Sequence, residues 1–323
     1  MPLFVVTTRL PGSALELLRA EGELRAADPS GVLPREELLV LVAGADVVLT
    51  QLGDRVDDEL LEAAGPDLRC VCNVAVGHDN VDLAAAARRG VAVTNTPGVL
   101  DDATADIALG LILAATRRLG EGERLIRAGR PWRWSMDFLL GRGLRDKLLG
   151  VVGLGAIGGR VAGRARAFGM RVAYNNRGEA PAALTGPLEA ERLELDELLA
   201  RADVVSLHCP LTEQTRHLIG ARELGLMKPT ATLVNTSRGP VVDEAALVVA
   251  LREGQIAAAG LDVFEREPEV EPGLLELENV VLVPHLGSAT LETRSAMAEL
   301  AARNAIAAAR DEALPTPVPL PAQ

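Results

Sequence analysis

Aromatic residues are scarce in this sequence, where Phe, Trp and Tyr together make up 2% of the 323 residues. Hydrophobic residues as a whole still amount to 48%, so an apolar core must be built mainly from Ala, Val and Leu. A chain of this length is long for one domain and natural for two. We therefore expect two domains whose cores contain few rings.

An excess of basic residues is also lacking, because 33 Lys and Arg stand against 45 Asp and Glu and give a formal net charge of −12. Binding a polyanion requires a basic face, so no nucleic-acid partner is expected. A small anionic substrate needs only a local positive site and stays compatible with this charge.

Long apolar runs are missing. The most apolar segment, residues 103–115, is too short to span a bilayer and contains Asp106 and Gly110. Residues 1–6 are typical of a first strand and not of a signal peptide. We therefore expect no membrane association and a cytoplasmic protein.

Cysteine is rare, and its count of three is odd, which fits a reducing compartment. Cys70 and Cys72 lie two residues apart on a strand-like run and share a face. A metal site there is conceivable, but no further ligands cluster nearby in the sequence. We predict buried structural cysteines and no metal.

Apolar runs alternate with helix-like segments in both halves of the chain. This rhythm is typical of βαβ units and parallel sheets. In the first half we expect strands at 4–7, 45–50, 68–74 and 91–94 and helices at 13–21, 57–64 and 82–89. In the second half we expect strands at 148–152, 171–174, 203–207, 232–235, 257–261 and 280–283, with helices at 157–168, 194–202 and 243–253.

Three segments interrupt this alternation. Residues 95–98 break the pattern before a helix that Asp101 or Asp102 caps and that runs to about residue 118. Residues 120–143 are polar, rich in glycine and carry both tryptophans, which indicates either an arm that packs on a partner subunit or a plain surface loop. A helix at 291–309 has no strand of its own and is expected to return to the first domain, and the tail 315–319 is expected to be extended or disordered.

The run 148–152 ends in Gly153-Leu154-Gly155-Ala156-Ile157-Gly158, the Gly-x-Gly-x-x-Gly pattern of a dinucleotide-binding turn. Gly153 allows the tight turn, Gly155 lets the backbone approach a pyrophosphate, and Gly158 lets the next helix pack on its strand. The first N–H groups of that helix would face the phosphates. The alternative is a tight turn without a ligand. The first half has no such motif, so the dinucleotide is assigned to the second.

Ligands of open parallel sheets bind beyond the carboxyl ends of the strands. Polar and ionisable residues follow each later strand of the second half. They are Asn175-Asn176-Arg177, His208-Cys209-Pro210, Thr236-Ser237-Arg238-Gly239, Asp262 with Glu265-Arg266-Glu267-Pro268, and Pro284-His285-Leu286-Gly287-Ser288.

Three of these residues suit the reduction of a ketone by a nicotinamide. His285 can deliver a proton to the developing alkoxide, because its unperturbed pKa lies near neutrality. Arg238 can hold a substrate carboxylate with its planar fork. Glu267 can orient the imidazole and favour its protonated form. Each residue alone could be an ordinary surface or strand-end residue, but the trio beyond a dinucleotide turn is far more specific.

The chain resembles the D-isomer-specific 2-hydroxyacid dehydrogenases. The matching segments run in family order and cover nearly the whole chain, at residues 77–82, 95–106, 153–158, 235–239, 261–268 and 284–290. The resemblance implies an α/β fold of two doubly wound parallel-sheet domains, a Rossmann-like coenzyme domain inserted into a flavodoxin-like substrate domain. The expected bounds are 1–99 with 288–323 for the discontinuous substrate domain and 100–287 for the coenzyme domain.

The resemblance also implies roles for individual residues. Arg238, Glu267 and His285 would be catalytic, and the backbone at Val76 and Gly77 would hold the substrate carboxylate. No metal is implied, and a homodimer would form through a helix and arm at about 101–145. Besides the glycine turn and the end of the second strand, the expected cofactor contacts are Thr104, His208, Cys209, Pro210, Thr215, Thr236, Ser237, Arg238, Asp262, His285 and Gly287.

The cofactor is expected to be NADP(H) in preference to NAD(H). NAD-binding domains usually carry an acid at the end of the second strand, which bonds the adenosine ribose. Asn175, Asn176 and Arg177 stand there instead. No acid repels a 2′-phosphate, and Arg177 can pair with one. Alternatively, Arg177 points to solvent and Asn175 bonds NAD.

Within the family, residues 94–106 and 134–141 are similar to glyoxylate/hydroxypyruvate reductases, in which a tryptophan at the position of Trp134 reaches the partner's substrate site. Trp134 could instead be only an interface anchor. The expected reaction is reduction of a small 2-oxo acid to the D-2-hydroxy acid, with domain closure near residues 98–100 and 286–289 excluding water. Alternatives are a D-3-phosphoglycerate dehydrogenase or another D-2-hydroxyacid dehydrogenase, or a dinucleotide-sensing corepressor-like protein.

Overall fold

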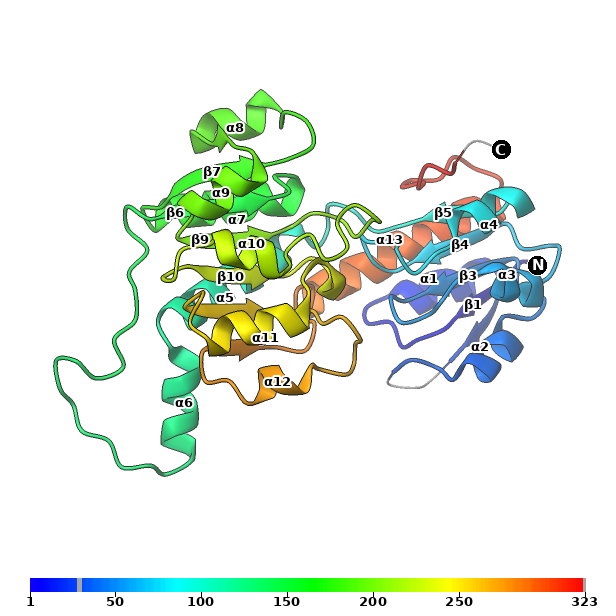
Figure 1. Cartoon of the computed structure of the whole chain (residues 1–323). Coiled ribbons are helices and arrows are strands. Elements are labelled where there is room, and N and C mark those ends of the chain that lie inside the picture. The colour runs from blue at the N-terminus through cyan, green and yellow to red at the C-terminus, as the bar shows by residue number, and fades with distance from the viewer. Residues whose placement is uncertain (28–30, 322–323) are drawn as a thin grey trace. The chain divides into compact units, whose positions relative to one another are not determined.

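The computed structural model describes residues 1–27 and 31–321. The chain divides into two compact units. Figure 1 colours the ribbon by residue number, so the segments of each unit can be followed along the chain. Unit 1 consists of Met1–Leu100 and Ser288–Gln323, and unit 2 is the continuous segment Asp101–Gly287. None of the helices in the described ranges has the length and apolarity needed to cross a membrane.

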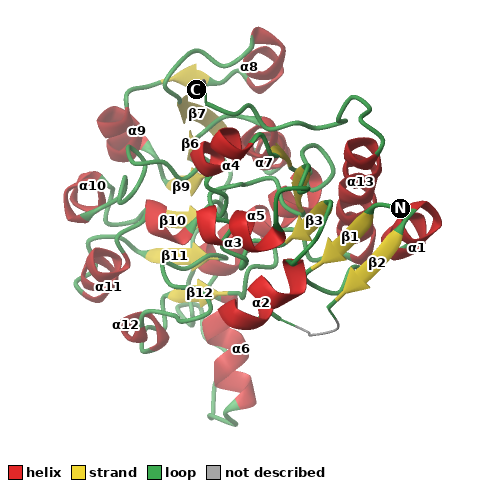
Figure 2. Cartoon of the chain, turned by 90° about the vertical axis from the view of Figure 1, so that its right-hand side faces the viewer, coloured by secondary structure: helices red, strands yellow, loops and turns green. Residues whose placement is uncertain are grey.

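Unit 1 is built on a parallel sheet of five strands in the order β2-β1-β3-β4-β5, the order of flavodoxin-like sheets. Helices cover both faces, and Figure 2 shows α1 and α13 on one side of β1 and β3 and α2 and α3 on the other. The strands are β1 Leu3–Val6, β2 Glu23–Ala26, β3 Val47–Thr50, β4 Cys70–Asn73 and β5 Ala92–Thr94. The helices are α1 Ala14–Glu21, α2 Arg35–Val42, α3 Asp58–Ala64, α4 Leu83–Arg89 and α13 Leu291–Ala309.

Both faces of the central strands are buried, which explains why their sequences are continuous apolar runs. Phe4 and Val6 of β1 point into the core under α1 and α13, and Val5 points into the core under α2, α3 and α4. Cys70 and Cys72 are buried free thiols on the α13 side. The described residues contain no group of three or more His, Cys, Asp or Glu placed to hold a metal ion.

Unit 2 contains a parallel sheet of seven strands in the order β12-β11-β10-β9-β6-β7-β8. Counted from β6, this is the doubly wound order 3-2-1-4-5-6 with one further strand at the edge. The strands are β6 Leu148–Val152, β7 Arg171–Asn175, β8 Glu191–Arg192, β9 Val204–Leu207, β10 Thr232–Asn235, β11 Ala258–Leu261 and β12 Val280–Leu282.

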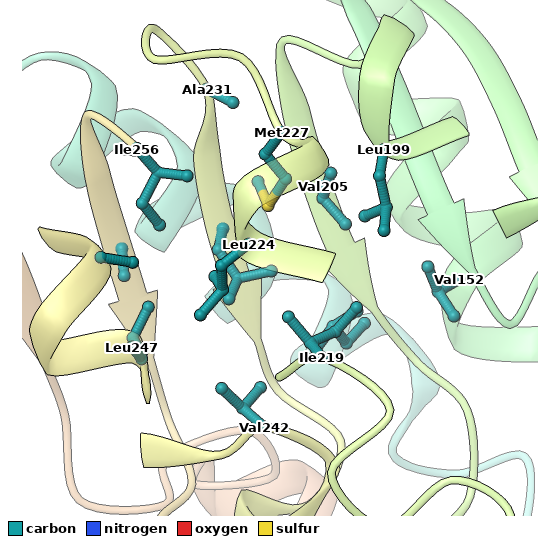
Figure 3. Packing of buried hydrophobic residues seen from close by; sticks show 14 of the residues in the cluster. Val152, Leu199, Val205, Ile219, Leu224, Met227, Ala231, Val242, Leu247 and Ile256 are labelled. Carbon is teal, nitrogen blue, oxygen red and sulfur yellow. The ribbon is translucent and has the colours of Figure 1, made fainter. Parts of the chain in front are cut away.

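Helices again cover both faces of the unit 2 sheet. α5 and α7 enclose one apolar cluster, and α9, α10, α11 and α12 enclose the other, part of which Figure 3 shows. The bounds are α5 Asp101–Thr116, α6 Leu119–Arg127, α7 Ala156–Ala167, α8 Ala182–Leu188, α9 Leu195–Arg201, α10 Ala221–Leu226, η1 Gly239–Val241, α11 Glu244–Arg252 and α12 Pro272–Leu275. The predicted fold class of two doubly wound parallel sheets is confirmed.

Several local expectations differ from the structure. The second half has seven strands and not six, because the edge strand β8 has only two exposed residues and leaves no apolar run. The first part of the expected irregular segment 120–143 lies in α6, Leu119–Arg127, a helix without a buried residue. The tail is extended and ordered, because the Val318 N–H bonds the Val93 carbonyl and Val318 is buried. The alternative of a disordered tail was wrong.

Candidate active site

Two glycines of the turn between β6 and α7 are required by the fold itself. Gly153 has a φ of 95°, which side-chain-bearing residues rarely adopt, and a Cβ there would lie 2.6 Å from the backbone nitrogen of Cys209. A Cβ on Gly158 would lie 2.4 Å from the Gly153 carbonyl oxygen. These two positions therefore set the tight turn and the close packing of α7 on β6.

Gly155 is different, because neither its backbone nor its packing requires glycine. Its φ is −107°, it is exposed, and a Cβ there would meet no atom within 4 Å. The free space lies at the N-terminus of the twelve-residue helix α7, where unpaired N–H groups favour an anion. The residues of the turn thus fit a dinucleotide whose pyrophosphate approaches the backbone at Gly155.

The two asparagines at the end of β7 are engaged within the protein. The Asn176 Oδ1 accepts a 2.7 Å hydrogen bond from the Leu154 N–H, and its Nδ2 donates to the Leu154 carbonyl at 3.3 Å. The Asn175 Nδ2 donates to the Leu193 carbonyl at 2.8 Å. Asn176 therefore holds the glycine turn, and the Leu154 side chain is buried in the core. Of the three predicted cofactor residues at the end of β7, Asn175 and Asn176 therefore have side-chain groups that are already hydrogen-bonded within the protein.

Arg177 is exposed, and among the described residues it makes no hydrogen bond or ion pair. A second cation lies at the same end of the sheet, because the Arg192 Nη2 donates to the Asn176 carbonyl at 3.3 Å. No sequence pattern pointed to Arg192, because the edge strand β8 that carries it has no apolar run. Positive charge is thus available where an acid is usual in NAD-binding domains.

The residues after β9 also lie against the glycine turn. Loss of solvation lowers the pKa of His208 to about 4, so its ring is neutral at pH 7. Its two ring nitrogens face Ser206 Oγ at 2.8 Å and Thr236 Oγ1 at 3.5 Å.

Burial raises the pKa of the Cys209 thiol to about 11, which keeps it protonated. The Thr215 hydroxyl donates to the Pro210 carbonyl at 2.7 Å, which links two more predicted cofactor residues.

The loop after β10 places Arg238 beside the loop after β11. A Cβ on Gly239 would lie 1.8 Å from the Phe264 carbonyl carbon, so only glycine permits this approach. The Asn235 Nδ2 donates to the Arg238 carbonyl at 2.8 Å, and its Oδ1 accepts from the Ser237 N–H at 3.0 Å. Asn235 therefore fixes the loop that carries Arg238, a function the sequence pattern did not reveal.

Glu267 and His285 form a hydrogen-bonded pair. The Glu267 Oε2 lies 2.8 Å from the His285 Nδ1, and its Oε1 accepts from the Phe264 N–H at 3.0 Å. Burial opposes ionisation of Glu267, but the hydrogen bond and positive charge of His285, the Phe264 N–H and the charge of Arg238 outweigh it and lower the Glu267 pKa. The ionised carboxylate favours the proton on Nδ1, and Nε2 has no hydrogen-bond partner within the described residues.

The backbone at His285 is held in an uncommon conformation. Its φ is 52°, in the left-handed region, and its N–H donates to the Asp262 carbonyl at 2.8 Å. Asp262, 1% exposed, accepts from the N–H groups of Leu286 at 2.5 Å and Gly287 at 2.9 Å. Burial raises the Asp262 pKa against these bonds. A Cβ on Gly287 would lie 3.3 Å from Thr104 Cγ2, so the Thr104 side chain packs directly against the backbone at Gly287.

Unit 2 therefore brings together the residues predicted as catalytic and those predicted to bind the cofactor. Contacts run from Asn176 through the glycine turn to His208 and Thr236, and from Thr104 through Gly287 to Asp262. Trp134 is not part of this group, because it is 76% exposed in the irregular segment after α6. Val76 and Gly77 belong to unit 1.

A comparison with family models shows which family the chain belongs to. Residues 109–287 match the model of the D-isomer specific 2-hydroxyacid dehydrogenase NAD-binding domain. The chain belongs to this family. It is an NAD(P)-dependent oxidoreductase of the 2-hydroxyacid dehydrogenase type, and the family predicted from the motifs is confirmed.

Individual relatives are similar to this protein over nearly its whole length. A glyoxylate reductase of Thermococcus litoralis is 47% identical over 319 residues, 97% of this chain and 96% of the relative. The structure of a glyoxylate reductase from Paecilomyes thermophila has a TM-score of 0.88 at 37% identity, covering 98% of each chain. The NADPH-dependent glyoxylate/hydroxypyruvate reductase of Sinorhizobium meliloti, in complex with NADP and malonate, has a TM-score of 0.84 at 34% identity and covers 98% of this chain and 96% of its own.

Proposed function

We propose that this dehydrogenase reduces small 2-oxo acids, glyoxylate to glycolate or hydroxypyruvate to D-glycerate. The observation that carries the proposal is the 2.8 Å pair of His285 Nδ1 and Glu267 Oε2, with the Arg238 charge acting on Glu267, in the unit that holds the glycine turn. The names of the relatives support glyoxylate as the substrate class.

In the proposed mechanism, a nicotinamide dinucleotide held at the glycine turn would supply the hydride that the carbonyl carbon of the 2-oxo acid needs. His285 donates its Nε2 proton to the carbonyl oxygen as negative charge develops there. Glu267 keeps the imidazole oriented through Nδ1 and stabilises the protonated ring. Arg238 is proposed to bind a carboxylate of the substrate. Independently, the backbone N–H groups of Val76 and Gly77 are proposed as donors to such a carboxylate.

The test is a panel of small 2-oxo acids, including glyoxylate, hydroxypyruvate and 3-phosphohydroxypyruvate, with NADPH and with NADH. Loss of reduced-cofactor absorbance should be fastest with glyoxylate or hydroxypyruvate. Fastest turnover of the phosphorylated substrate would favour a phosphoglycerate dehydrogenase. No turnover with any member would overturn the proposal and favour a dinucleotide-sensing binding protein.

The proposed cofactor is NADP(H) in preference to NAD(H), because Arg177 is exposed and unpaired within the described ranges and Arg192 adds a second cation. A charge-assisted hydrogen bond to the 2′-phosphate contributes about 1.5–3 kcal/mol. Arg177→Ala should therefore lower the ratio of kcat/KM with NADPH to that with NADH by roughly 10- to 100-fold. An unchanged ratio would remove this assignment.

The matched control for Arg177 is Arg216→Ala, which removes another exposed arginine of unit 2 that has no ion-pair partner in the described part of the chain. It should leave the ratio unchanged. A similar fall in both variants would mean that only the net charge of the protein matters.

A second copy of the chain is the proposed partner of α6 and residues 128–143, which Figure 1 shows projecting from the rest of unit 2. Trp132 stacks on Phe138 with ring centroids 6.0 Å apart. Large apolar side chains are concentrated on this arm and are at least half exposed, namely Leu119, Ile126, Trp132, Trp134, Met136 and Leu140. Such exposure is typical of an interface.

Trp134→Ala should change the ranking of 2-oxo acids if the side chain forms a wall of the partner's substrate site. Light scattering of the same variant reports whether the homodimer persists. A variant that dissociates but keeps the substrate ranking would make Trp134 an interface anchor only. Leu275→Ala, which removes a side chain 65% exposed elsewhere in unit 2, is the control.

A further inference from the structure

The loop after β4 carries two backbone carbonyls that are held by asparagine side chains. The Asn95 Nδ2 donates to the Val76 carbonyl at 2.8 Å. The Asn73 Nδ2 donates to the Gly77 carbonyl at 2.9 Å. Both assignments of the amide nitrogen follow from chemistry, because a carbonyl oxygen can only accept.

Fixing these carbonyls also fixes the N–H groups of the same peptides. The peptide unit is planar and trans, so its N–H points opposite to its carbonyl. The N–H of Gly77 therefore points away from Asn95, and the N–H of His78 points away from Asn73. Within the described residues, the N–H groups of Val76, Gly77 and His78 have no hydrogen-bond acceptor. Successive free N–H groups of this kind form a concave site for an anion.

The orientation of the Asn73 side-chain amide is fixed by the residues around it. It is fully buried, and its Oδ1 accepts from the Thr50 hydroxyl and from Asn80 Nδ2, each at 3.2 Å. Its Nδ2 also donates to Asn80 Oδ1 at 3.1 Å, so Asn73 and Asn80 form a reciprocal amide pair. Asn80 in turn donates to the carbonyls of Gln51 and Asp54 at 3.1 and 3.0 Å. The amide of Asn73 therefore cannot rotate without breaking bonds at both of its ends.

Asn95 is anchored through its backbone by the C-terminal tail. The Thr316 hydroxyl donates to the Asn95 carbonyl at 2.6 Å, and the Asn95 N–H donates to the Thr316 carbonyl at 3.3 Å. Thr316 is itself held by the side chain of Asn304 at 2.8 Å. The two asparagines thus approach the loop from different elements, Asn73 from the end of β4 and Asn95 from the segment after β5.

We infer that Asn73 and Asn95 are positioning residues that aim the N–H groups of Gly77 and His78 at the carboxylate of the substrate. The inference rests on the proposed function only for the identity of the anion as a small 2-oxo acid. Neither asparagine needs to touch the substrate, since each acts through a backbone carbonyl. Their loss should weaken the binding of the carboxylate while leaving cofactor binding and hydride transfer intact.

The test uses the full chain with Asn73→Ala and, separately, Asn95→Leu, which is uncharged and similar in size but has no N–H to donate. The KM for glyoxylate should rise about 10- to 100-fold in each variant, the range for loss of a hydrogen bond to a charged group. The kcat at saturating glyoxylate and the Kd for NADPH should stay within about twofold of the wild type. The Kd for oxamate, an unreactive carboxylate analogue, should rise in parallel with the KM.

Asn279→Leu is the matched control, because Asn279 also donates to two carbonyls, those of Leu251 and Ala257, at 3.2 Å, but lies in unit 2. An equal rise in KM in this variant, or an unchanged oxamate Kd in the two test variants, would overturn the inference. Because the buried Asn73→Ala variant can fail to fold, the half-buried Asn95→Leu variant decides in that case. If the wild type turns over no 2-oxo acid, the proposed function fails, and oxamate binding still decides the inference.

Discussion

Replacing His285 by asparagine is expected to lower kcat with glyoxylate by about 10²- to 10⁴-fold, the usual contribution of general acid catalysis. Asparagine keeps a polar side chain of similar reach but has no proton to deliver at neutral pH. The Kd for NADPH, measured by fluorescence titration, should change far less than kcat, because His285 is only one of the predicted cofactor contacts and the variant leaves the glycine turn and the end of β7 intact. The measurement is a single-turnover absorbance trace at saturating cofactor and substrate.

The chain provides a close control for this variant. His217 also has a left-handed backbone, with a φ of 50°, and its Nε2 lies 2.5 Å from a carboxylate oxygen of Glu265. It is part of neither the predicted trio nor the predicted cofactor residues. His217→Asn should retain wild-type kcat. If His285→Asn kept more than about a tenth of wild-type kcat, or if His217→Asn lost as much, His285 would not be the proton donor.

Replacing Gly155 by asparagine is expected to remove most cofactor affinity without unfolding the protein. Asparagine is among the favoured residues at a helix N-cap, the position Gly155 occupies in α7, and a Cβ there meets no atom within 4 Å. Forcing a side chain into space that a ligand needs costs about 1–3 kcal/mol. The NADPH Kd should therefore rise roughly 5- to 150-fold, while Tm stays near the wild-type value.

Two further glycines of α7 distinguish the explanations for such a loss. Gly163→Asn adds the same side chain on an exposed face of α7, where a Cβ also meets nothing, and should leave NADPH binding unchanged. Gly158→Ala places a Cβ 2.4 Å from the Gly153 carbonyl and should lower Tm. Unimpaired NADPH binding in Gly155→Asn would mean that no phosphate approaches the turn.

The central strands could be predicted because both of their faces are buried and their sequences are continuous apolar runs, as in Val47–Thr50 and Val204–Leu207. Edge elements escaped the same reasoning. β2 has no buried residue, and β8 has two exposed ones, so neither produces a hydrophobic signal. Helix α6 was missed for a similar reason, since Gly120 and Gly122 interrupt it and none of its residues is buried.

The positions of the site residues were easier to predict than the directions of their side chains. Arg238 and His285 follow strands of one parallel sheet, so the carboxyl-end rule locates them without a structure. The bonds of Asn73, Asn95 and Asn176 follow from no such rule. An asparagine in a loop can turn its amide to solvent or to a neighbouring carbonyl, and only the packed structure decides which carbonyl lies within reach.

Helix α13 has a consequence for the order in which the chain folds during synthesis. Its alanines, Ala298, Ala301, Ala302 and Ala305, complete the apolar core on one face of the unit 1 sheet, and they lie about two hundred residues after the last strand of that sheet. Unit 2, by contrast, is continuous in sequence. A ribosome therefore releases every residue of unit 2 before α13, so until the final segment emerges α1 is the helix of this cluster that covers that face of the N-terminal strands.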